Sequence, residues 1–70
     1  MAPRSMRALS REEVVEITGI SSATIWRMER RGDFPSRRQL TEGRVGWLDT
    51  EVEEWLKTRP VVVRVQEARP

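Results

Sequence analysis

The chain has 70 residues, which is enough for one small domain. It contains no cysteine and no histidine, and this excludes disulfides and metal sites built from those ligands. The net charge is only +2, so the placement of the charged residues is more informative than their excess. We expect neither a signal peptide nor a membrane span, because the sequence has no apolar run of the required length.

Residues 1–8 are basic and are expected to form a flexible arm. Ser10 and Glu13 then match the S-x-x-E capping box that starts many helices. We predict a helix over residues 11–18, followed by Gly19 as the residue that ends it in the left-handed conformation.

A second helix is predicted over residues 22–31. Ser21 is a favourable N-cap residue, and Gly32 with the following Phe34-Pro35 ends the helix. Two short helices that are joined by a three- or four-residue turn near a glycine are typical of a helix-turn-helix.

The next segment is predicted to be a β-hairpin. Strands over residues 37–40 and 45–48 flank a four-residue connection, Thr41-Glu42-Gly43-Arg44, in which the glycine favours a turn. Gly46 lies within the second strand and indicates a bulge or a close approach of another backbone.

A third helix is predicted to follow, with Asp49 as its N-cap. Its apolar stripe consists of Val52, Trp55 and Leu56. Residues 60–70 are a valine-rich tail that forms either an extra strand or a mobile end. The predicted fold is therefore α+β and mostly helical, a small winged helix-turn-helix over residues 9–59 with three helices and a two-stranded wing.

Apolar spacing predicts which faces are buried. Val14 and Ile17 share one face of the helix over residues 11–18, and Trp47 and Trp55 are expected in the core. In the helix over residues 22–31, about 100° per residue places Ser21 and Met28 on the inner side with Ile25. Three residues point outward, namely Ala23, Arg27 and Arg30, and three lie on the flanks, namely Thr24, Trp26 and Arg31.

This outward face has a small side chain at its N-terminal end and arginines beyond it, and a DNA-recognition helix requires this arrangement. Arg27 is a candidate for reading a base or for contacting a phosphate, and Arg30 and Arg31 are candidates for phosphate contacts. The hydroxyls of Ser21 and Ser22 stand where a phosphate could bind the free helix amides, although simple capping also explains Ser21.

The remaining candidates have a structural and a functional interpretation. Trp26 either stacks on DNA or packs against the hairpin or the N-terminal arm. The hairpin arginines, Arg37, Arg38 and Arg44, either cross a phosphate ridge toward the minor groove or belong to a solvated loop. The basic residues as a whole also fit an ordinary solvated surface.

Two blocks of sequence resemble the AlpA family of phage-type regulators. The first is LSREEVVEITGISSATIWRMERRGDFP, over residues 9–35, and the second is VGWLDTEVEEWL, over residues 45–56. The family is grouped with MerR-like winged helices and phage excisionases. The resemblance implies a helix-turn-helix with a wing, and a role in either transcriptional control of mobile-element genes or excision.

We therefore expect sequence-specific binding of double-stranded DNA in the cytoplasm, at the nucleoid, by a transcriptional regulator without enzymatic activity or cofactor. The sequence offers no nucleophilic side chain that is paired with a general base to activate it. One alternative is an architectural factor that bends DNA and recruits an integrase. Another is a protein-binding adaptor that uses the acidic third helix. Self-association on repeated sites through the valine-rich tail and contact with RNA polymerase are further partner hypotheses.

Overall fold

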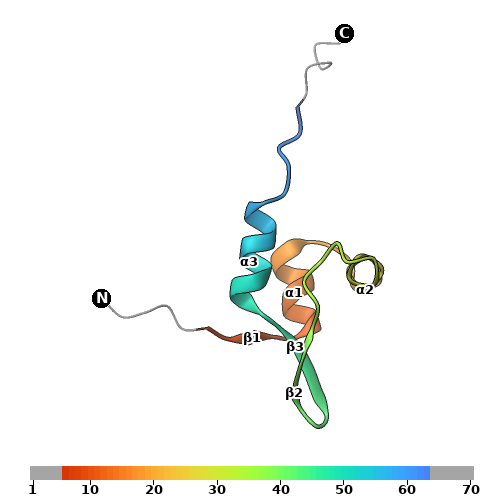
Figure 1. Ribbon diagram of the computed structural model, residues 1–70, viewed down its shortest axis with the longest axis vertical. Coiled ribbons are helices and arrows are strands. Elements are labelled where there is room, and N and C mark those ends of the chain that lie inside the picture. The colour runs from red at the N-terminus through yellow and green to blue at the C-terminus, as the bar shows by residue number, and fades with distance from the viewer. Residues whose placement is uncertain (1–5, 64–70) are drawn as a thin grey trace, which may run out of the picture.

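The computed structural model describes residues 6–63, and its elements are shown in Figure 1. In chain order they are β1 (Ala8–Leu9), α1 (Arg11–Thr18), α2 (Ser22–Arg30), β2 (Arg38–Thr41), β3 (Arg44–Leu48) and α3 (Asp49–Lys57). Three helices with a small antiparallel sheet confirm the predicted α+β class and are consistent with a winged helix-turn-helix. Among residues 6–63, no helix is long and apolar enough to cross a membrane.

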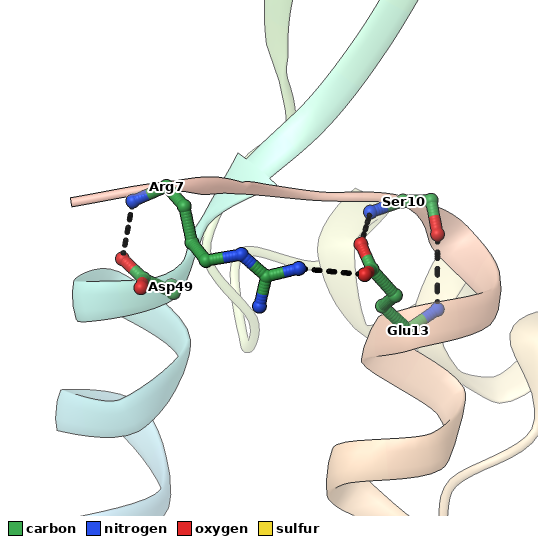
Figure 2. Close-up of polar contacts among 4 residues, drawn as sticks. All are labelled: Arg7, Ser10, Glu13 and Asp49. Carbon is green, nitrogen blue, oxygen red and sulfur yellow. Dashed lines mark hydrogen bonds and ion pairs between the residues drawn. The ribbon is translucent and has the colours of Figure 1, made fainter. Parts of the chain in front are cut away.

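Helix α1 begins and ends at the predicted residues because both of its caps are local. The Ser10 hydroxyl accepts from the Glu13 amide at 3.1 Å, and the Glu13 carboxylate accepts from the Ser10 amide at 2.8 Å. Figure 2 shows both bonds of this capping box. Gly19 adopts φ 74°, and its amide donates to the Val15 carbonyl at 2.7 Å. The helix therefore ends at the residue type that adopts the left-handed conformation most readily.

Helix α2 is one residue shorter than predicted. The Ser21 hydroxyl accepts from the Thr24 amide at 3.3 Å, which confirms Ser21 as the N-cap. Arg31 is the C-cap and Gly32 follows at φ 81°, so the glycine turns the chain away from the helix axis. The amide of Asp33 then donates to the Met28 carbonyl at 2.8 Å and closes the last turn.

The sheet has three strands rather than the two predicted for the wing, in the order β1-β3-β2. Ala8 pairs with Leu48 and Leu9 with Trp47, so this part of the chain belongs to the folded domain and not to a loose arm. A two-residue strand is too short to show alternation, and it forms because β3 offers it an edge. The rest of the predicted arm, residues 1–5, and residues 64–70 of the tail lie outside the described residues.

Strands β2 and β3 form the predicted hairpin, but two residues connect them instead of four, since Thr41 pairs with Arg44. The pairing is irregular between Gln39 and Thr41, so the bulge lies on β2. Gly46 marks a close approach, because a Cβ there would lie 2.8 Å from the Leu9 carbonyl oxygen. The hairpin projects away from the three helices in Figure 1, and we call it the wing.

Asp49 is the first residue of α3 and not its N-cap, which is Leu48. The chain passes from β3 into α3 without a loop, and the Asp49 carboxylate binds a different segment. It accepts from the Arg7 amide at 3.1 Å (Figure 2). The Asp49 amide also donates to the Arg7 carbonyl at 2.9 Å. The local pattern predicted that Asp49 caps α3. In the structure, its contacts with a distant segment hold the chain before β1 in place.

The core lies between the helices and the sheet and contains Leu9, Val14, Ile25, Phe34, Trp47 and Val52. Trp47 is buried as predicted, and its indole donates to the Pro35 carbonyl at 2.9 Å. Trp55 is only half-buried. It packs edge-to-face on Phe34, with the two ring centroids 4.7 Å apart. Ile17 is 49% exposed, contrary to prediction, and it lines an open cavity together with residues of α3.

Candidate nucleic-acid interface

Helix α2 has a buried side and an arginine-rich side. Ile25 is only 1% exposed and Met28 is half-buried, as predicted. Arg27 and Arg30 are exposed on the opposite side, and Ala23 is exposed at its N-terminal end. Ser21 is exposed as well, although helical periodicity places it toward the core, because an N-cap residue lies outside the helical spiral.

Polar side chains follow one another along the outer side of α2. The Ser21 hydroxyl donates to the Thr24 hydroxyl at 3.0 Å, and the Arg27 guanidinium donates to the same Thr24 oxygen at 3.2 Å. This chain of contacts directs the Arg27 guanidinium toward the N-terminal end of the helix. Ala23, whose side chain is small, is exposed at the same end.

The arginines of α2 differ in their partners. Arg31 forms an ion pair with Asp33 at 3.2 Å, and the Arg30 guanidinium lies 4.7 Å from the ring centroid of the exposed Trp26. Within residues 6–63, neither Arg27 nor Arg30 has a carboxylate at ion-pair distance. Their positive charges are therefore available to an anionic ligand.

The two neighbouring arginines of the wing point to opposite sides, as successive residues of an extended chain do. The Arg37 guanidinium lies 3.4 Å from Glu29 of α2. The Arg38 guanidinium contacts Glu51 of α3 at 2.7 and 3.4 Å, and the hydrogen bond to Glu51 raises the pKa of Arg38 above its ordinary value. Arg37 thus faces α2, whereas Arg38 holds the wing against α3.

Arg44 lies at the start of β3, beside the turn, and is exposed. In the described part of the chain, no carboxylate lies within ion-pair distance of its guanidinium. The wing therefore carries an unpaired positive charge close to its tip.

Two adjoining cavities connect α2 with the wing. A cavity of about 240 Å³ brings together Ser22, Ala23 and Trp26 of α2 with Arg37. A second, of about 270 Å³, extends along the hairpin to Arg44. Three residues line both cavities, namely Arg11, Arg37 and Trp47. We call these two cavities together the trough.

Arg11 is a basic residue of this surface that the sequence alone did not single out. It is the first residue of α1, directly after the cap, and lies between α2 and the wing. A cation at this position opposes the helix dipole, so folding alone does not favour it. That conflict is a signal in the sequence, but only the fold shows that Arg11 joins the other basic residues.

The family described as prophage CP4-57 regulatory protein (AlpA) matches residues 7–60. The chain is 38% identical over 53 residues to an uncharacterized protein, ORF88, of Enterobacteria phage P4. This match covers 76% of this chain and 60% of the phage protein. It is 34% identical over 61 residues to the DNA-binding transcriptional activator AlpA of Escherichia coli strain K12. This match covers 79% of this chain and 87% of the Escherichia coli protein. These matches confirm the resemblance seen in the sequence, and the chain belongs to the AlpA family of prophage regulatory proteins.

Proposed function

We propose that this chain is a DNA-binding transcriptional regulator that places α2 in the major groove of a duplex and the wing beside it. The proposal rests on one observation above all. Ile25 fixes α2 in the core, while Ala23, Arg27 and Arg30 are exposed. A recognition helix needs this division, because its outer residues must reach base edges and phosphates.

The position of each outer residue suggests a role. Ala23, with the neighbouring Ser22, allows the N-terminal end of α2 to approach the base edges closely. Arg27 is oriented by Thr24 and is our candidate for bidentate recognition of guanine. Arg30, stacked on Trp26, is better suited to a phosphate or sugar at the edge of the groove.

The wing supplies a second, sequence-independent contact. Arg44 near its tip has an exposed guanidinium, which suits a phosphate at the adjacent minor groove. Arg37 lies on the α2 side of the wing and adds to the same basic surface. We assign Arg38 to the stability of the wing, because its guanidinium makes two contacts with Glu51. Arg31 is an outer phosphate contact that must exchange its Asp33 partner.

The comparisons support the same conclusion. The Escherichia coli relative is a DNA-binding transcriptional activator, and the region that the family model matches contains α2 and the wing of this chain. A regulator acting on genes of a mobile element therefore fits both the family and the surface. Nothing in this function requires an enzymatic group, and the family is one of regulatory proteins.

The test is selection of bound duplexes from a pool of random sequences, followed by binding measurements on the selected site and on a scrambled duplex. We expect one recurring sequence that is bound at least ~1,000-fold more tightly than the scrambled duplex. A reporter whose promoter contains that sequence should then respond to the protein. A chain that enriches no sequence and binds no duplex at low salt would contradict the proposal.

A further inference from the structure

We propose that Arg11 contacts a backbone phosphate of the DNA strand that runs between α2 and the wing. This inference rests on the proposed function, and it assigns a contact to a residue that lies outside both the recognition helix and the hairpin. The ligand is a phosphodiester of duplex DNA, recognised by charge and not by base sequence.

The position of Arg11 is the first argument. Arg11 lines the cavity next to α2 and also the cavity next to the wing, and Arg37 and Trp47 are the other residues common to both. Trp47 is buried, so its ring contributes an apolar wall to both cavities of the trough. The two arginines therefore line the trough together with a buried apolar residue, between the two elements that approach DNA in the proposed complex.

Duplex geometry explains why a phosphate strand belongs there. The major and minor grooves alternate along the duplex, and each boundary between them is one sugar–phosphate strand. A protein that places a helix in the major groove and a hairpin at the adjacent minor groove must accommodate that strand between its two elements. In this chain the space between α2 and the wing is the trough.

The local energetics of Arg11 give a second, independent argument. Its side chain is 65% exposed, and its one ion pair among the described residues is a 3.4 Å contact with the adjacent Glu12. It occupies the first turn of α1, where a positive charge is unfavourable. Arg11 therefore contributes little to the fold, which is what a residue retained for a ligand would show.

The carboxylates of the trough define its charge. Glu29 lines the α2 side and is committed to Arg37, with a side chain only 11% exposed. Glu12 lines the wing side, and a backbone hydrogen bond, together with Arg11, lowers the pKa of its carboxyl group. Glu12 is thus ionised at neutral pH and opposes a phosphate near Arg11. Removing its charge should strengthen binding to DNA of any sequence.

The experiment compares Arg11→Gln with Lys57→Gln, which removes one positive charge from α3, outside the trough. Affinity is measured for the selected and the scrambled duplex over a range of salt concentrations, with Tm measured in parallel. We expect Arg11→Gln to bind both duplexes about tenfold more weakly, with the salt slope reduced by about one. Its Tm should be unchanged or raised, and Lys57→Gln should change neither affinity by more than about twofold.

Two further variants test the charge itself. Arg11→Lys should recover most of the affinity, because a phosphate contact requires a cation and not a fork of donors. Glu12→Gln should bind both duplexes more tightly than the wild-type chain, and it should lose that gain when Arg11→Gln is also present.

Unchanged affinity and salt slope in Arg11→Gln, with a wild-type chain that binds DNA, would overturn this inference and leave the proposed function intact. A loss of affinity that tracks a lowered Tm at an unchanged slope would overturn it as well. A wild-type chain that binds no duplex would instead overturn the proposed function itself.

Discussion

The Glu29 carboxylate joins helix α2 to the wing through Arg37. It accepts a hydrogen bond from the Arg37 amide at 2.7 Å and lies 3.4 Å from the Arg37 guanidinium. The amide contact fixes the chain where it enters β2, so the two elements that face DNA in the proposed complex have a defined separation. Glu29 is therefore a positioning residue, although a carboxylate is an unexpected neighbour for a phosphate strand.

Replacing Glu29 should separate this positioning role from simple charge removal. Glu29→Ala should lower the free energy of unfolding by about 1–2 kcal/mol, because it leaves the Arg37 amide without its acceptor. Glu29→Gln keeps an acceptor oxygen, so its free energy of unfolding should fall by less. Urea unfolding measures both, with Glu54→Ala on the exposed side of α3 as the control. An equal loss in Glu29→Gln and Glu29→Ala would show that the hydrogen bond to the amide is unimportant.

Arg27→Ala should reduce the preference for the selected sequence by about 1–3 kcal/mol while leaving binding to scrambled DNA largely intact. The reason is that Thr24 directs the Arg27 guanidinium toward the N-terminal end of α2, which approaches the bases in the proposed complex. Arg30→Ala is the matched control, and it should weaken binding to both duplexes alike. If Arg27→Ala also weakens both duplexes equally, Arg27 contacts a phosphate and does not read a base.

The wing arginines should behave differently from each other. Arg44→Gln should weaken binding to every sequence and lower the salt slope by about one, since Arg44 is exposed and unpaired among the described residues. Arg38→Gln should retain the slope, because its guanidinium is engaged by Glu51. A reduced slope in Arg38→Gln would contradict this assignment and indicate that both arginines contact DNA.

Gly46→Ala should destabilise the domain by about 1–3 kcal/mol. A Cβ at this position would lie 2.8 Å from the Leu9 carbonyl oxygen and 2.9 Å from a methyl group of Leu40, so β1 would have to move. Gly43→Ala in the turn is the control, because a Cβ there meets nothing within 4 Å. Thermal unfolding of the two variants gives the comparison. Equal Tm values would mean that β1 shifts without loss.

Acid should weaken the α1 capping box. The Ser10 amide, and then Arg7, lower the pKa of Glu13 below its ordinary value of 4.5, so the folded state binds fewer protons than the unfolded state near that pH. Glu13 therefore stabilises the fold above this range, and the contribution is lost as the pH falls through the lowered pKa. Tm measured against pH should fall less steeply in Glu13→Gln than in the wild-type chain. Parallel curves would exclude this group as a source of acid sensitivity.

The features that sequence reasoning predicted well depend on local chemistry. The capping box of Ser10, the Ser21 cap and the glycine after each of the first two helices require only neighbouring residues, and all of them are present. The outward face of α2 also followed from helical periodicity, once Ile25 was assigned to the core.

The features that were missed depend on contacts between distant segments. Strand β1 exists because β3 has a second edge, and Asp49 binds Arg7, which is far away in sequence. The different roles of Arg37 and Arg38 follow from Glu29 and Glu51, whose positions are set only by the packed helices. Periodicity within one segment contains no information about such partners.

Strand β3 is shared by the body of the domain and by the wing, and this limits how the wing can move. Its C-terminal residues Trp47 and Leu48 pair with β1, its earlier residues pair with β2, and α3 begins directly after it. The hairpin is thus the continuation of a strand that is fixed in the core. It is not a separate segment that moves independently of the domain. Most of the conformational entropy lost when a hairpin is ordered has already been lost on folding, so a ligand meets a preorganised surface.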